Sequence, residues 1–546
     1  MRLTGLPLVA LRHGLRLPAV RALAWRLGRR DLGVDLLAEL PASARSRVGD
    51  GPAPLAGAPP RGWTHDDLPP RPARAGAAAL QRAFSDGSTS PTEVLEDLLG
   101  ALGRGELGEA RHSPWVSLDV EGARRAAAAA GERLRAHRPL GPLDGVCVPI
   151  KDHLDVAGLP THGGTAHRRH RATTDAFVVD RLRRGGAVLL GTTHATEWGL
   201  NALGTNAHAC FPGNVHDGNR APGGSSTGSG VAVALGHAPV ALGSDGGGSL
   251  RVPAALQGIY ALKPTFQRLG RSGDTWARGS LGHLGPLGAT VGDLVALLAV
   301  TAARDPDDPA TWLAPDGHDP RPWWDALRRG VRGARLGVVA SAWADADGPV
   351  AAACEEGLRA LESAGARLVD VTLPHESVAP AVGALLIVSE ACANLSDDRS
   401  RHARAYGDEI TVTLAAMSGL SAEELLGAAR VRTRLRETTA QLFRTQVDLL
   451  AMPTTASVAP PIPRRRPADL LDPAATAALV RFTFLANLTG LPAGTAPVGR
   501  VGGLPVGLQL VGDAWDEASV IAGLAALERS GVGLMPPPRG HRHALA

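Results

Sequence analysis

The stretch ALGSDGGGSLRVPAALQGIYALKPT, residues 241–265, carries the strongest structural signal in this chain. An apolar run leads into three consecutive glycines, and a single serine, Ser249, follows them directly. Glycine runs of this kind serve as phosphate cradles, as tight turns or as pockets around a nucleophile, because no Cβ blocks a close approach to the backbone. The P-loop pattern requires Lys and then Ser or Thr after the last glycine, and neither Leu250 nor Arg251 continues it. The phosphate interpretation is therefore weak.

The segments around this stretch alternate between helix and strand patterns. Residues 175–186 predict a helix and a glycine turn, residues 187–193 predict a buried strand, and residues 229–245 repeat that order. A strand–helix–strand unit is predicted within 334–373, and 515–531 predicts a closing helix with acidic residues in its first turn. QVDLLAMPTT and LPVGLQLVG add further strands. The pattern predicts an α/β fold with one large mixed β-sheet flanked by helices on both faces.

The N-terminal residues differ from the rest of the chain. Leucines and arginines alternate there as in a basic amphipathic helix interrupted at Pro18, and a Pro/Gly-rich linker, VGDGPAPLAGAPPRG, follows. We expect residues 1–70 to be a helical extension with a linker, and residues 71–540 to be the main domain. The helix is expected to pack on that domain, with membrane-surface contact through residues 1–40 as the alternative. The sequence contains no secretory signal pattern and no stretch near 18 uninterrupted apolar residues.

Composition excludes some function classes. The net charge of +4 contains no basic tract and aromatic residues make up 3% of the chain, so we expect no nucleic-acid partner. The four cysteines are scattered without a C-x-x-C pair, which predicts neither a zinc site nor a disulfide framework and favours a cytoplasmic location.

The chain has 57 lysines and arginines, yet only Lys151 and Lys263 are lysines. Lysine can lose its proton in a protein and arginine cannot, so each survivor is a candidate for chemistry that arginine cannot perform. Lys151 follows the apolar run VCVPI, which reads as a strand that enters the core. Burial there would lower the lysine pKa and make it a base for a serine nucleophile.

A second serine cluster, APGGSSTGSG, lies at 221–230. Its G-x-S-x-G pattern would make Ser226 the nucleophile of an α/β-hydrolase elbow. That elbow requires a strand directly before it, and the polar NVHDGNR precedes the cluster instead. The elbow is therefore the weaker interpretation.

These segments together resemble the amidase signature family of serine hydrolases, over about residues 75–530. GPLDGVCVPIKD, APGGSSTGSG, the stretch at 241–265 and NLTGLPAGTAPVG carry the resemblance, and Ser225 lies 24 positions before Ser249, which is the interval of the family. The resemblance implies that Ser249 is the nucleophile, that Lys151 is the base, and that Ser225 bridges them after a cis peptide bond. It also implies an oxyanion hole built from the N–H groups of Gly246, Gly247, Gly248 and Ser249.

Further positions match the family as supporting residues. Asp245 and Arg251 would brace the loop, Ser244 would lie near the lysine, and Ser226 completes the serine pair. Lys263 matches a structural position, and Thr227 replaces the commoner glycine. Enzymes that amidate glutamyl-tRNA usually carry an acidic residue seven positions before the asparagine of NLTGLP, and this chain has Val480 there.

We therefore expect an amidase that hydrolyses a carboxamide or N-acyl amine through a Ser249 acyl-enzyme. The segment FTFLANL favours an apolar acyl or aryl group. The alternatives are an acyl transferase that uses the same acyl-enzyme and the A-type component of a glutamine amidotransferase. We expect no cofactor and no metal, a small-molecule amide as partner, and a homodimer as one open assembly. The cluster of His162, His167 and His170 is interpreted as a solvated basic loop in preference to a metal site.

Overall fold

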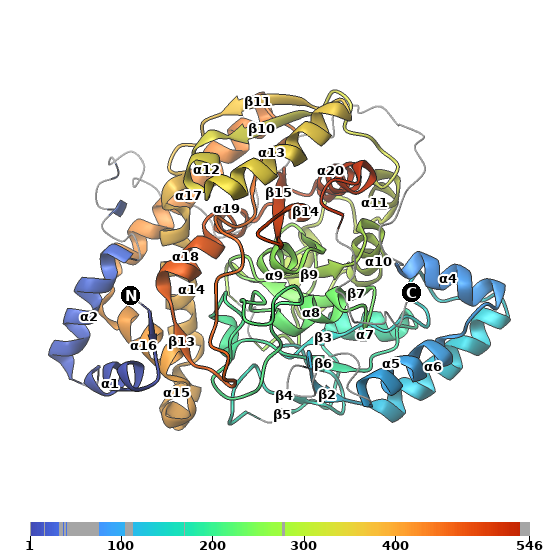
Figure 1. Ribbon diagram of the computed structural model, residues 1–546, viewed down its shortest axis with the longest axis horizontal. Helices are drawn as coiled ribbons and strands as arrows, with labels where there is room; N and C mark the ends of the chain where they lie inside the picture. Colours follow the sequence, from blue (N-terminus) through green and yellow to red (C-terminus); the bar gives the residue numbers. More distant parts are fainter. Residues whose placement is uncertain are drawn as a thin grey trace.

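The computed structural model describes residues 2–15, 17–31, 36–37, 40, 76–103, 113–168, 170–275 and 279–534. An eleven-stranded sheet runs through its centre (Figure 1). Strands β10 and β3 are each parallel to both of their neighbours, and the remaining pairs are antiparallel, so the prediction of a mixed sheet is confirmed. The spatial order is β11 (Arg367–Val371), β10 (Arg335–Val339), β12 (Leu449–Pro453), β15 (Leu504–Gly512), β14 (Ala493–Val501), β8 (Tyr260–Lys263), β9 (His283–Gly288), β7 (Val240–Asp245), β3 (Ile150–Lys151), β6 (Gly191–Thr193) and β2 (Trp115–Leu118).

Helices cover both faces of the sheet, as predicted. Neighbouring residues of a strand point to opposite faces, and β15 shows this directly. Gly507 packs against Ala255 of α9 (Arg251–Gln257), whereas Leu508 packs against Gly357 of α13 (Gly348–Ser363). Helix α8 (Thr227–Ala234) contacts α9, while α10 (Val291–Thr301) and α13 contact α20 (Glu517–Ser530).

A further group of helices forms its own apolar cluster beside the sheet. In it, α14 (Ala379–Asn394) packs on α16 (Asp408–Ala416), α17 (Ala422–Thr445) and α19 (Phe484–Thr489). Among the described helices, the segment Glu376–Asn394 is long and apolar enough to cross a membrane, but 56% of its most apolar window is buried inside the molecule. Core helices of this kind have the same length and composition.

The N-terminal helices α1 (Leu6–Gly14) and α2 (Pro18–Asp31) are separated at Pro18, as predicted. Leu8 and Leu15 of this segment cluster with Val412 of α16, and Arg12 Nη1 lies 2.5 Å from Asp408 Oδ1. The expectation that this extension packs on the main domain is therefore confirmed. The linker sequence at 48–62 and the boundary at 70/71 lie outside the described residues.

The remaining described helices and strands are peripheral. Helices α4 to α6 project together at one end of the molecule in Figure 1. The bounds are α4 (Ala77–Asp86), α5 (Pro91–Gly103), α6 (Val120–Arg135), α7 (Phe177–Arg184), α11 (Arg321–Ala326), α12 (Ala340–Asp345), α15 (Ser396–His402), α18 (Pro473–Val480), β1 (Leu3–Thr4), β4 (Pro160–Thr161), β5 (His170–Arg171) and β13 (Leu470–Leu471).

Candidate active site

Lys151 ends the central strand β3 and is fully buried. Ile150 pairs with Thr192 of β6 on one side and with Leu242 of β7 on the other. Both ladders are parallel, so the carboxyl ends of the three strands meet at one edge of the sheet. The apolar run before Lys151 places the strand in the core, and its side chain is 0% exposed there.

Two serine hydroxyls contact the buried amine. Lys151 Nζ lies 2.7 Å from Ser225 Oγ and 2.8 Å from Ser244 Oγ, which comes from the neighbouring strand β7. Burial lowers the pKa of Lys151 to about 7, although the negative charges of Asp274 and Asp245 act in the opposite direction. A neutral amine that can accept a proton is therefore accessible near pH 7.

The two serines of the GGSS segment have different surroundings. The Gly224–Ser225 peptide bond is cis, and Ser225 lines a pocket together with Ser249. Ser226 is 0% exposed, and its hydroxyl donates to the carbonyl of Ser244 and accepts from the Ser244 N–H. Both hydrogen bonds hold Ser226 to the backbone of β7, so the structure does not present it as an elbow nucleophile.

The glycine loop turns Ser249 toward the pocket. Ser249 and Gly246 stay partly exposed, whereas Gly247 and Gly248 are buried. Within the described part of the chain, the N–H groups of Gly246, Gly247 and Ser249 donate to no other protein group. The prediction that Gly248 contributes its N–H to an oxyanion hole is wrong, because that N–H donates to Asp245 Oδ1 at 2.7 Å.

Protein side chains behind the loop also require glycine. A Cβ on Gly247 would lie 2.5 Å from the Phe484 ring, and a Cβ on Gly246 would lie 2.9 Å from Ile387. Gly248 has a φ of +130°, which disfavours any side chain, and a Cβ there would lie 2.5 Å from Thr483 Oγ1. The packing of α14 and α19 therefore constrains this loop in addition to any substrate.

A buried ion pair holds the loop in place. Arg251 uses all five of its N–H donors, and Asp245 accepts from Arg251, from Asn487 and from the backbone N–H groups of Gly248 and Leu250. Burial acts to raise the pKa of the Asp245 carboxyl, but the Arg251 guanidinium outweighs it and holds that pKa well below its usual range. The remaining Arg251 donors bind the Thr483 carbonyl, Gln509 Oε1 and Asn487 Oδ1 at 2.8, 2.6 and 2.6 Å.

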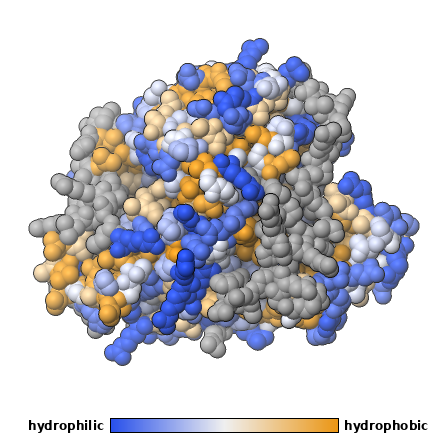
Figure 2. Space-filling view, viewed as in Figure 1, coloured by the Kyte–Doolittle hydropathy of each residue, from blue (hydrophilic) through white to orange (hydrophobic). Residues whose placement is uncertain are grey.

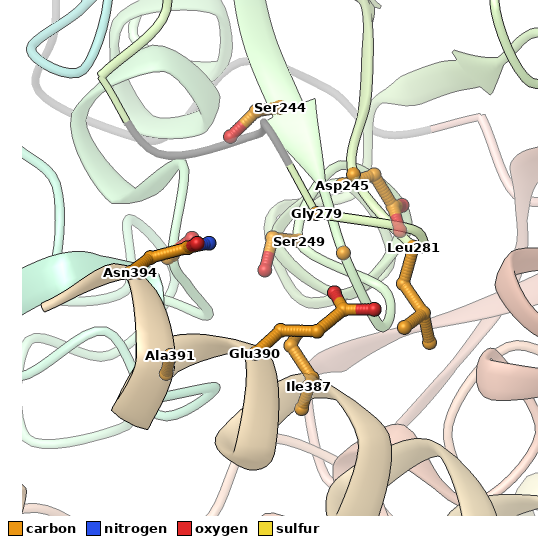
Figure 3. Close-up of a pocket in the computed structure, with 13 residues that line it drawn as sticks. Ser244, Asp245, Ser249, Gly279, Leu281, Ile387, Glu390, Ala391 and Asn394 are labelled. Atoms are coloured by element: carbon orange, nitrogen blue, oxygen red, sulfur yellow. The ribbon is translucent and has the colours of Figure 1, made fainter.

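The pocket in front of Ser249 has a volume of about 430 Å³, part of it open to solvent. Figure 3 shows that the side chains of Glu390 and Asn394 point from α14 toward Ser249. The sequence analysis did not predict these residues, since α14 carries no motif. The lining residues are Gly199, Ser225, Ser244, Asp245, Gly246, Ser249, Gly279, Leu281, Gly282, Ile387, Glu390, Ala391 and Asn394.

The segment FTFLANL is absent from this lining, which consists of described residues. Its Phe484 packs behind Gly247, and Thr483 donates to the Gly247 carbonyl at 2.5 Å. The expectation of an apolar acyl or aryl group therefore loses its support from that segment.

The structure separates the three histidines of the loop at 162–170. His170 is exposed, but His162 contacts Asp152, and His167 lies 2.9 Å from Asp398 with its ring stacked on His402. The interpretation as a solvated basic loop is therefore wrong for His167. Within the described residues, His167, Asp398 and His402 are the three potential metal ligands that lie together, within 4.8 Å of one another.

A family model described as Amidase matches residues 99–521. The chain belongs to the amidase signature family. The amidase is also similar to curated proteins with different names. It is 36% identical to the A-type component of the glutamyl-tRNA(Gln) amidotransferase of Chloroflexus aurantiacus, over 81% of this chain and 94% of that protein. It is 30% identical to a fatty acid amide hydrolase of Medicago truncatula over 82% and 75% of the two chains.

Solved structures agree with this assignment. The peptide amidase of Stenotrophomonas maltophilia superimposes with a TM-score of 0.72 at 28% identity, covering 85% of this chain and 98% of that one. The amidase is thus a hydrolase of amide bonds with the fold that the resemblance implied.

Proposed function

We propose that the amidase hydrolyses the C–N bond of a carboxamide or an N-acyl amine through an acyl-enzyme on Ser249. One observation carries this proposal. A fully buried lysine with a pKa of about 7 contacts Ser225, and Ser225 shares a pocket with the serine that follows three glycines.

In the proposed reaction, Ser249 Oγ attacks the amide carbon while its proton passes to Ser225. Ser225 in turn gives its own proton to neutral Lys151. The carbonyl oxygen becomes an oxyanion, and the N–H groups of Gly246, Gly247 and Ser249 are the unengaged donors for it among the described residues of the loop. Such donors contribute roughly 3–4 kcal/mol each to the transition state.

The second half of the reaction returns the protons. Lys151 gives its proton back through Ser225 to the leaving nitrogen, and the C–N bond breaks. Water then attacks the acyl-enzyme by the same relay and releases the carboxylic acid. No cofactor enters this scheme.

A fluorophosphonate probe tests the nucleophile. We expect stoichiometric labelling on Ser249, because its hydroxyl is accessible and the others of the serine group are engaged with Lys151 or β7. Peptide mapping by mass spectrometry identifies the labelled residue, and Ser249→Ala should remove both the label and the activity. Labelling on Ser226 would contradict the proposal and restore the elbow.

Two related functions are distinguishable from hydrolysis. An acyl transferase would pass the acyl group to an amine in place of water, and product analysis with added amines separates the two. The similarity to a glutamyl-tRNA(Gln) amidotransferase favours a second candidate, the A-type component of such a complex. Val480 lies half-buried at the end of α18 and supplies no carboxylate, so we favour the independent hydrolase. The mass of the purified protein in solution distinguishes a monomer, the expected homodimer and a heteromeric complex.

We also propose a cytoplasmic enzyme whose N-terminal residues touch a membrane surface. Leu6, Leu17 and Leu23 are 83%, 60% and 55% exposed on α1, α2 and the turn between them. Apolar residues gather over these helices at the left edge of Figure 2. The buried leucines of the same segment already attach it to α16, so the outward leucines are free to enter a lipid interface.

A vesicle assay tests this contact. We expect the chain to co-sediment with anionic phospholipid vesicles, and the triple replacement of Leu6, Leu17 and Leu23 by serine should weaken binding at least about tenfold, since each buried leucine contributes about 1.5–3 kcal/mol. Equal sedimentation of both proteins would contradict the proposal. Comparing long-chain with short-chain amides, with and without residues 1–70, shows in addition whether the extension serves substrate entry.

A further inference from the structure

One acidic side chain stands out in the pocket, that of Glu390. It is the only acidic or basic residue of α14, whose sequence APAVGALLIVSEACAN is otherwise uncharged. Ile387, Glu390, Ala391 and Asn394 are spaced three or four positions apart and therefore form one face of the helix. All four line the pocket, and Figure 3 shows that this face looks toward Ser249.

The carboxylate is held firmly by the backbone opposite. Glu390 Oε2 accepts the N–H of Ser280 at 2.9 Å, and Oε1 accepts the Ser280 hydroxyl. A Cβ on Gly279 would collide with Oε2, so the glycine allows this close approach. A carboxylate has about four acceptor sites, and these two bonds leave the others for a ligand in the pocket.

No positive side chain of the described residues neutralises Glu390 by direct contact. Arg432 binds the hydroxyl and the carbonyl of Ser280 at 2.7 and 2.8 Å, and it does not form an ion pair with Glu390. The other acidic group in the lining, Asp245, is paired with Arg251. The described lining residues include no lysine, arginine or histidine.

We propose that Glu390 binds a positively charged nitrogen of the substrate, so that the pocket takes amides that carry a primary ammonium group near the scissile bond. This inference rests on the proposed reaction at Ser249. Leu281, Ile387 and Ala391 would contact an apolar stem between the amide and the cation. Aminoacyl and ω-aminoacyl amides, and amides of diamines, have this chemistry. A buried or half-buried carboxylate favours such a cation over a methyl group of the same size by about 10- to 100-fold.

Pairs of amides of equal size test the charge preference. Glycinamide, β-alaninamide and 5-aminopentanamide are compared with propanamide, butanamide and hexanamide, and N-(3-aminopropyl)acetamide is compared with N-butylacetamide. At pH 8 we expect kcat/KM to favour the ammonium member at least about tenfold in one arm, acyl or amine. Glu390→Gln should reduce that ratio at least about tenfold, and Ser280→Ala, which removes one of two bonds that position the carboxylate, should reduce it in part.

Glu362→Gln is the matched control, because Glu362 is exposed on α13 and this change should leave the ratio at the wild-type value. The inference is overturned if no pair shows a preference, or if Glu390→Gln lowers both members of each pair equally. If Glu390→Gln does not fold, competitive inhibition of the wild-type enzyme decides: butylammonium should inhibit at least about tenfold more tightly than 1-pentanol, and equal inhibition overturns the inference.

The two proposals fail in different ways. Turnover retained in Ser249→Ala would contradict the reaction, whichever amide is preferred. Fluorophosphonate labelling of Ser249 together with equal kcat/KM values within every pair would leave the reaction intact and remove only the role of Glu390.

Discussion

Replacing Lys151 with methionine will abolish amide hydrolysis and yield a protein that unfolds less readily than the wild type at pH 7. The proposed reaction has no other base, since Ser225 and Ser244 contact only this amine among the described ionisable side chains. We expect kcat/KM to fall at least about 10³-fold, within the range measured for positioned general bases. Lys151→Arg should lose a similar amount, because arginine stays protonated.

The pH dependence follows from the direction of the Lys151 shift. Its pKa of about 7 means that the neutral base is lost as the pH falls, so kcat/KM should decline below pH 7 and level off above it. In the unfolded chain a lysine titrates near 10.4, so between pH 7 and about 10.4 the unfolded state binds more protons and stability rises with pH. At pH 7 the buried lysine therefore costs about 4 kcal/mol, which sets the upper limit for the gain in Lys151→Met.

Lys263 provides the matched control. It is equally buried, and its Nζ donates to the carbonyls of Pro264 and Leu491 at 3.0 and 2.6 Å, away from the serines. Lys263→Met should therefore keep the activity of the folded fraction. Urea denaturation at pH 7 and pH 10 measures the stability change, and the advantage of Lys151→Met should shrink at pH 10. A Lys151→Met enzyme with wild-type kcat/KM would refute the assignment of the base.

Replacing Arg251 with methionine will have the largest effect on stability. The guanidinium and the Asp245 carboxylate are both 0% exposed, and all five guanidinium donors are engaged. Removing one member of a buried ion pair leaves the other charge uncompensated, which costs about 3–5 kcal/mol. The glycine loop should also loosen, because Asp245 holds the N–H groups of Gly248 and Leu250.

Urea denaturation and fluorophosphonate labelling measure these two effects. Arg82→Met, an exposed site on α4, should change the free energy of unfolding by less than about 0.5 kcal/mol. Asp245→Asn combined with Arg251→Met removes both charges, so its effect should be smaller than the sum of the single changes. Strict additivity, or a single change of less than about 1 kcal/mol for Arg251→Met, would contradict the role of the pair.

Local pattern predicted much of the fold. The strand at 238–245 and the helices at 175–186 and 515–531 appear close to where hydrophobic periodicity and turn residues place them. The pattern succeeded there because each element is short, continuous and flanked by glycine or a polar cap. The linker and the domain boundary stay predictions, since they lie outside the described residues.

The pocket beyond the serines could not be predicted in this way. Glu390 lies about as far along the chain from Ser249 as a domain is long, on a helix without a motif. Which helix face meets the nucleophile depends on how α14 packs against α17 and α19. For the same reason, FTFLANL was expected near the substrate, although it lies behind the loop.

The sequence alone identified the chemistry: a serine after three glycines, a second serine 24 positions earlier, and one of two lysines in an arginine-rich chain. These residues stand in continuous motifs, so their spacing is visible without a fold. Only the tertiary structure decided that Lys151 is fully buried, that the Gly248 N–H belongs to Asp245, and that a carboxylate faces Ser249. Burial, hydrogen-bond partners and the electrostatics of a pocket arise between segments far apart in the chain, and no local pattern records them.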